Sequence, residues 1–188
     1  MKITWVMGCN GVGKSTLMDT VDAGWEQYGT IQVGRMMRAK YPPDHFKGSN
    51  NPKHTADEAW QMLLDGLAAH YVSGKKHVFV DGQPRDVKQV QDCLRLWPDS
   101  NYLHLFASEE SRSKRCEGRD GADPEKMKLA IARHESDMVN NYKVLCVLME
   151  AGARITTNNT EFDLLSGYGE PRYHYFYNQI IREMVEMK

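Results

Sequence analysis

The chain lacks several features that would place it in whole classes of proteins. No hydrophobic run approaches the roughly 20 residues that a membrane-spanning helix needs. No charged-then-apolar leader precedes the first apolar run, so we expect a cytoplasmic protein with no membrane partner. The 24 basic and 25 acidic residues give a net charge of -1, and this balance gives no support for a nucleic-acid partner.

Paired cysteines are also lacking. Cys9, Cys93, Cys116 and Cys146 are scattered and form no C-x-x-C unit, so neither a zinc site nor a disulfide framework is expected. The seven histidines are dispersed as well, without the spacing of a metal-ligand pair. Four unpaired thiols suit a reducing compartment.

What the chain does contain is a regular alternation of strand and helix patterns. With 188 residues, 41% of them hydrophobic, we expect one domain over residues 1–188. The candidate strands are 2–7, 30–33, 77–81, 101–107 and 153–157. The candidate helices are 14–24, 34–40, 55–73, 86–95, 108–118, 124–150 and 171–187. This order predicts an α/β fold of three layers, α/β/α, around a five-stranded parallel sheet.

A glycine-rich segment between the first strand and the first helix carries the strongest chemical signal. Residues 8–16 match the phosphate-binding pattern G-x-x-x-x-G-K-[ST] in the strand–loop–helix context that it needs. Backbone N–H groups of such a loop converge on a phosphate chain, and the helix that follows adds its positive dipole end. The residues expected to bind the phosphates of ATP are Asn10, Gly11, Val12, Gly13, Lys14, Ser15 and Thr16. The alternative is a glycine-rich turn that binds nothing.

A second motif, Asp81-Gly82-Gln83-Pro84-Arg85, follows the third candidate strand. Parallel strands deliver their carboxyl ends to one sheet edge, so Asp81 is expected beside the phosphate loop. There Asp81 and the hydroxyl of Ser15 would hold Mg²⁺. The planar fork of Arg85 suits a second phosphate. Alternatively, Asp81 only caps the turn.

Two further arginine-containing segments could complete a cleft. Gly34-Arg35-Met36-Met37-Arg38 follows the second candidate strand, and Arg115-Cys116-Glu117-Gly118-Arg119 ends a helix. Arg115 and Arg119, four residues apart, share one helical face and could clamp phosphates or stack on a base. The alternative for each segment is a solvated charged face.

The order of these four motifs resembles that of the adenylate kinase-like nucleoside monophosphate kinases, over residues 1 to about 160. The resemblance implies a P-loop kinase with a helical acceptor-binding region at about 34–74 and a short lid at about 116–126. Arg38 and Arg85 would hold the acceptor monophosphate beside Gly34 and Gly82. Lys14 and Arg119 would stabilise the transferred phosphoryl group, and Arg115 would lie against the adenine of ATP.

The chain departs from the family pattern near the acceptor. Val33, Arg35 and Gln83 stand where the family has threonine, an acid and phenylalanine. Either Lys128 or Arg133 replaces the family's arginine after the lid.

The resemblance also suggests an acceptor. Gln89, four residues after Arg85, matches the adenine-reading glutamine of adenylate kinases, and its alternative is a solvent-facing helix position. We therefore expect transfer of the γ-phosphate of Mg-ATP to AMP or dAMP. The competing functions are a kinase for another nucleoside monophosphate or for a small-molecule hydroxyl, and a non-catalytic nucleotide-binding regulator. We expect a monomer or a weak homodimer, because the aromatic C-terminal helix favours core packing over self-association.

Overall fold

Five parallel strands form one sheet in the order β2-β3-β1-β4-β5. The computed structural model describes residues 1–41, 53–120, 124–160 and 171–187, without the side chains of 53–55, 118–120, 124–136 and 171–174. The strands are β1 (Lys2–Met7), β2 (Tyr28–Gln32), β3 (His77–Asp81), β4 (Asn101–Phe106) and β5 (Arg154–Asn159). The helices are α1 (Lys14–Gly24), α2 (Val33–Lys40), α3 (Lys53–Val72), α4 (Val87–Leu96), α5 (Glu109–Asp120), α6 (Pro124–Glu150) and α7 (Pro171–Glu186).

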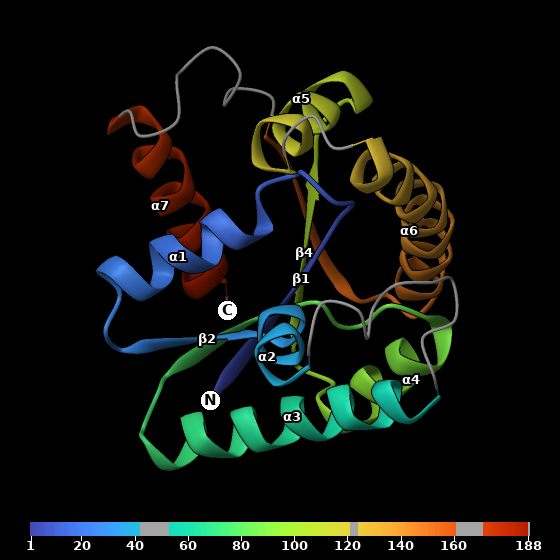
Figure 1. Ribbon diagram of the computed structural model, residues 1–188. Helices are drawn as coiled ribbons and strands as arrows, with labels where there is room; N and C mark the ends of the chain where they lie inside the picture. Colours follow the sequence, from blue (N-terminus) through green and yellow to red (C-terminus); the bar gives the residue numbers. More distant parts are fainter. Residues whose placement is uncertain (42–52, 121–123, 161–170, 188) are drawn as a thin grey trace.

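Helices cover both faces of this sheet, as Figure 1 shows. Helices α1 and α7 pack side by side on one face, and α2, α3, α4 and α6 contribute buried side chains to the other. The predicted three-layer α/β/α fold with a five-stranded parallel sheet is thereby confirmed. In the described part of the chain, no helix is both long and apolar enough to cross a membrane.

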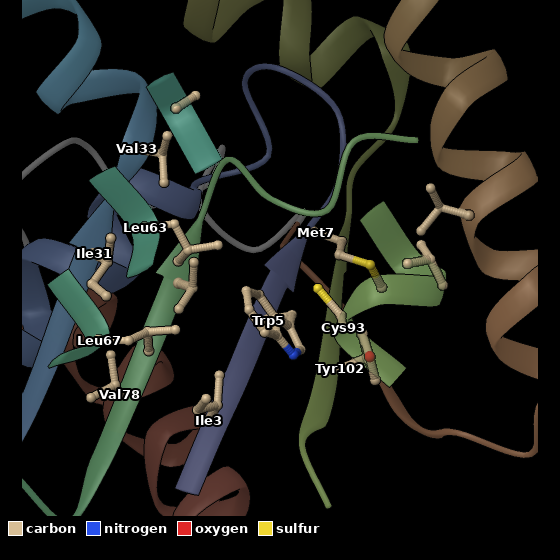
Figure 2. Packing of buried hydrophobic residues seen from close by; sticks show 14 of the residues in the cluster. Ile3, Trp5, Met7, Ile31, Val33, Leu63, Leu67, Val78, Cys93 and Tyr102 are labelled. Carbon is tan, nitrogen blue, oxygen red and sulfur yellow. The ribbon is translucent and has the colours of Figure 1, made fainter. Parts of the chain in front are cut away.

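The larger core lies between the sheet and the α2, α3, α4 and α6 layer. Figure 2 shows Ile3, Trp5 and Met7 of β1 facing this layer, because alternate residues of a strand point to the same side. Trp5 is fully buried, and its indole Nε1 donates a hydrogen bond to Ser100 Oγ at 2.9 Å. That bond satisfies the one polar group of the side chain in the apolar interior.

The second core lies between the sheet and the pair α1 and α7. Tyr177, Ile180, Ile181 and Met184 of α7 are all buried against it. The prediction that the aromatic C-terminal helix packs as core is therefore confirmed for Tyr177, Ile180 and Ile181, and it is wrong for Tyr175, which is 66% exposed.

Three strands differ in their bounds from the prediction, and the smallest difference is that β4 ends at Phe106 rather than residue 107. β2 begins at Tyr28 rather than residue 30, and β5 is Arg154–Asn159 rather than 153–157. Gly29 concealed the start of β2, because glycine is a poor strand former. In the structure a Cβ on Gly29 would lie 2.6 Å from the His70 ring. Glycine at this position therefore lets His70 of α3 pack directly against the backbone of β2.

The buried His77 predicts a loss of stability in acid. Burial, with smaller contributions from the charges of Lys2 and the N-terminus, lowers the pKa of His77 from 6.5 to about 4. The imidazole stays neutral in the folded protein, where its Nε2 lies 2.8 Å from Thr4 Oγ1, but it takes up a proton in the unfolded chain below pH 6.5. The free energy of unfolding should therefore fall by about 3 kcal/mol between pH 6.5 and pH 4 from this group alone.

Urea unfolding across that pH range, for wild type and His77→Gln, measures this contribution. The variant should show a shallower decline, since glutamine does not titrate. Parallel pH curves for the two proteins would contradict the assignment.

Candidate phosphate-binding site

The carboxyl edge of the sheet gathers three of the four predicted motifs. The strand register pairs Val6 with Asp81 and Asp81 with Gln32, so β1, β3 and β2 end side by side. The phosphate loop follows β1, the Asp81 motif ends β3, and α2 continues directly from β2. Segments far apart in the sequence thus meet at the edge where open α/β sheets bind ligands.

The phosphate loop has the backbone that its glycines permit. Gly8 and Gly11 have φ values of 135° and 81°, which disfavour other residues. A Cβ on Gly8 would lie 2.4 Å from Leu105 O, and one on Gly11 would lie 2.8 Å from Arg112 O. The loop is therefore pressed against the end of β4 and the start of α5, and both positions require glycine.

Lys14 and the N-terminus of α1 give this loop its positive character. The Lys14 ammonium donates to the carbonyl oxygens of Gly8 at 2.8 Å and Cys9 at 2.9 Å, so it lies over the loop. No side chain in the described residues caps the start of α1, and its first turn holds no acid. Uncapped N–H groups beside a lysine provide the donors that an anion needs.

Asp81 ends β3 with an unpaired carboxylate oxygen. Its Oδ1 is buried and has no hydrogen-bond partner among the described residues. A buried carboxylate oxygen without a partner lowers the stability of the folded protein. Such an oxygen fits a role in holding Mg²⁺ together with the exposed hydroxyl of Ser15. Among the described residues, no group of three or more histidine, cysteine or acidic side chains could hold a metal without phosphate ligands.

Arg38 and Arg85 approach the same point on the backbone. A Cβ built on Gly34 would lie 3.4 Å from Arg38 Nη1 and 3.9 Å from Arg85 Nη2, so both guanidinium groups lie against Gly34. The Arg85 Nε donates to Gly82 O at 2.9 Å, which turns that side chain back toward α2. Neither arginine takes part in any of the ion pairs found among the described residues.

Gln89 has a local role that the sequence analysis did not predict. Its Oε1 accepts a hydrogen bond from the Arg85 backbone N–H at 2.7 Å, and its own N–H donates to Asp86 Oδ1 at 2.9 Å. This is a reciprocal cap at the start of α4, and the spacing Asp86-x-x-Gln89 is the signal that could have revealed it. Gln89 is half-buried, and its carboxamide oxygen is engaged in this cap.

Two arginines of α5 are buried rather than solvated. Arg112 is 7% exposed and donates from Nε to Ala107 O at 3.1 Å, while Arg115 is 9% exposed and bonds to Gly11 O. The interpretation of this helix as a solvated charged face is therefore wrong for these two positions. Arg112 was missed as a site residue because nothing in its sequence neighbourhood separates it from the exposed Lys114.

Cys9 within the loop is not an activated thiol. Burial raises its pKa above the ordinary value. The charge of Arg112, the next largest effect, lowers the pKa, Asp137 raises it, and Lys14 and the Asn141 hydrogen bond lower it. A tolerated cysteine fits these surroundings better than a nucleophile.

Several predicted positions lie outside what the structure describes. The side chains of Arg119, Lys128 and Arg133 are among them, so their roles stay predictions. The same holds for residues 121–123 of the lid predicted at about 116–126.

Comparison with known proteins supports the fold and not a family. No known family pattern and no curated protein sequence matches the chain. Shikimate kinase from Bacteroides thetaiotaomicron matches in structure with a TM-score of 0.63 and 13% identity, covering 99% of both chains. A sugar kinase from Janibacter sp. HTCC2649 matches with a TM-score of 0.60 and 16% identity, covering 99% of this chain and 95% of its own. Both structures share the predicted three-layer fold, whereas the kinase activity and the closer resemblance to nucleoside monophosphate kinases stay predictions.

Proposed function

We propose that this chain is an ATP-dependent phosphotransferase whose small-molecule acceptor carries an anionic group. The observation that carries the proposal is the convergence of Arg38 and Arg85 on Gly34, at the sheet edge that also holds the phosphate loop. Both side chains are exposed and take no part in the described ion pairs, and an anion bound between two such like charges would offset their repulsion. A phosphate or carboxylate on the acceptor would supply it.

The donor side follows from the loop. Backbone N–H groups of residues 10–16 and the Lys14 ammonium would bind the phosphates of ATP. Ser15 and Asp81 would hold Mg²⁺, which supplies positive charge to the phosphates when bound. Lys14, together with Arg119, would stabilise the charge that develops on the phosphoryl group during transfer.

A nucleoside monophosphate is the acceptor that the order of the motifs suggests, whereas the comparisons give better support to a hydroxyl acceptor. An oxygen of its phosphate would form a bond to the γ-phosphorus of ATP, while the bond to the β,γ-bridging oxygen breaks and its electron pair leaves with ADP. Such an oxygen is already ionised, so no base is needed. The strand beside β3 ends in Gln32, a side chain that cannot accept a proton from a hydroxyl group.

A hydroxyl acceptor is the second candidate, because the matched structures are a shikimate kinase and a sugar kinase. Asp81, whose Oδ1 has no hydrogen-bond partner among the described residues, would then be a candidate for taking up the hydroxyl proton, in competition with its role toward Mg²⁺. The two arginines would bind a carboxylate or phosphate elsewhere on that acceptor.

The base of a nucleotide acceptor is less well supported. The carboxamide oxygen of Gln89 that would pair with the adenine amino group already accepts the Arg85 N–H. AMP and dAMP therefore rest on the family resemblance, and Gln89 is proposed here mainly as a helix cap.

ADP formation from Mg-ATP against a panel of acceptors tests the proposal. The panel contains the ribo- and deoxyribonucleoside monophosphates, shikimate, gluconate, neutral sugars and a control without acceptor. We expect turnover on one or two anionic acceptors and none on the neutral sugars. Turnover on neutral sugars alone, or bound ATP with no acceptor-dependent turnover, would contradict it, and the latter result would indicate a nucleotide-binding regulator.

A further inference from the structure

Arg115 of α5 makes three hydrogen bonds that join the phosphate loop to the end of β5. Its Nη1 donates to Gly11 O at 2.9 Å and to Thr160 Oγ1 at 3.3 Å, and its Nη2 donates to Thr160 O at 2.6 Å. Arg115 is 9% exposed, and Thr160 is completely buried. The guanidinium therefore lies behind the loop, inside the protein.

The backbone of α5 also touches the same glycine. A Cβ on Gly11 would lie 2.8 Å from Arg112 O and 3.2 Å from Arg112 Cα, so no side chain separates helix and loop there. Thr160 is fixed in turn, since its N–H and its Oγ1 both donate to Phe106 O, at 2.8 and 3.1 Å. Thr160, which accepts hydrogen bonds from Arg115, is thus itself held in place by β4.

We propose that Arg115 is a positioning residue that aims the Gly11–Val12 peptide at the phosphates. In the trans peptide, the N–H of Val12 points away from the Gly11 carbonyl. Because Arg115 holds that carbonyl toward the protein interior, the Val12 N–H is directed to the opposite, phosphate-binding side of the loop. Arg115 acts through the backbone of Gly11, and it does not touch the nucleotide base.

This role depends on one part of the proposed function, which is that the loop binds phosphate. It differs from the adenine contact that the family resemblance implies, because a guanidinium engaged with Gly11 and Thr160 is held below the loop. The two roles make opposite predictions for a ligand that has phosphates and no base. Inorganic tripolyphosphate is such a ligand.

The test is calorimetric titration of Mg-ATP and, separately, of magnesium tripolyphosphate into wild type, Arg115→Met and Arg115→Lys. We expect Arg115→Met to weaken both ligands by the same factor, about tenfold or more. Arg115→Lys keeps the charge without the fork and should recover only part of the loss. Thr160→Val, which removes one acceptor and leaves the arginine in place, should weaken both ligands by about threefold.

Lys114→Met is the matched control. Lys114 precedes Arg115 on α5, is exposed and pairs with Glu110, so its removal changes the helix charge without touching Gly11. Both affinities should stay within about twofold of wild type, since surface ion pairs contribute little.

Two results would overturn the proposal: weakened ATP with unchanged tripolyphosphate, which indicates a base contact, or full recovery in Arg115→Lys, which indicates charge alone. If Arg115→Met does not fold, Thr160→Val and Arg115→Lys provide the test. For each of them, the loss of affinity for Mg-ATP is compared with the loss for magnesium tripolyphosphate. These titrations need no acceptor. Arg115-dependent binding without acceptor turnover would therefore refute the proposed function and leave this inference standing.

Discussion

Lys14→Met is expected to lower acceptor-dependent ADP formation by on the order of 10³-fold or more. In the structure the ammonium donates to the carbonyl oxygens of Gly8 and Cys9 and so lies at the loop that would hold the phosphates. Methionine keeps an unbranched side chain of similar length and removes the charge. Steady-state kinetics at saturating Mg-ATP would show the loss in kcat.

The same substitution should leave the fold in place. Lys14 is half-buried and its loss frees two loop carbonyls, so the free energy of unfolding should change by no more than about 2 kcal/mol. Lys143→Met, at an exposed position of α6, is the control for a lysine-to-methionine change and should keep full activity. Turnover like that of wild type in Lys14→Met would refute the assignment of residues 8–16 as the phosphate loop.

The second large effect is expected at the acceptor arginines. Arg85→Ala should raise the KM of the acceptor and lower kcat/KM by on the order of 10²-fold, because a charge-assisted bidentate contact is lost. Arg38→Ala should act in the same direction, and the KM of ATP should change little in both variants. Initial rates with one substrate varied at a time separate the two KM values.

A double-mutant cycle then asks whether the two arginines hold one anion. Because both guanidinium groups lie against Gly34, the losses should not add, and the coupling free energy should be about 1 kcal/mol or more. Arg35→Ala is the matched control on the same helix, since Arg35 is exposed and pairs with Asp19 Oδ1 at 3.3 Å. Additive losses, or an acceptor KM that Arg35→Ala changes as strongly, would contradict a shared site.

Local patterns predicted most of the fold. The glycines, Lys14 and the flanking strand and helix identified the phosphate loop, because such a loop is built from consecutive residues whose backbone angles depend on residue type. Strand and helix periodicity located nearly every element within a few residues. The start of β2 was not predicted, because a glycine at position 29 does not favour a strand. Glycine fits there because the His70 ring of α3 packs against it.

The site residues were less predictable wherever their surroundings come from distant parts of the chain. Asp86 and Gln89 form a cap whose pattern is local, and it could have been recognised from the sequence alone. Arg115 could not be distinguished from its solvated neighbours, because its acceptors Gly11 and Thr160 lie far away in the sequence. Arg112 donates to the nearby Ala107 O, but its packing against Gly11 depends on the distant phosphate loop.

By itself, the amino-acid sequence determined the α/β class, the strand and helix order, and the position of the loop that we expect to bind phosphate, because these follow from residue type and spacing over short stretches. Only the tertiary structure decided that Arg38 and Arg85 meet at Gly34, that Arg115 lies behind the loop, and that the Gln89 oxygen caps a helix. The reason is physical: whether a charged or polar side chain is buried, and which acceptors it meets, depends on which strands end side by side at the sheet edge.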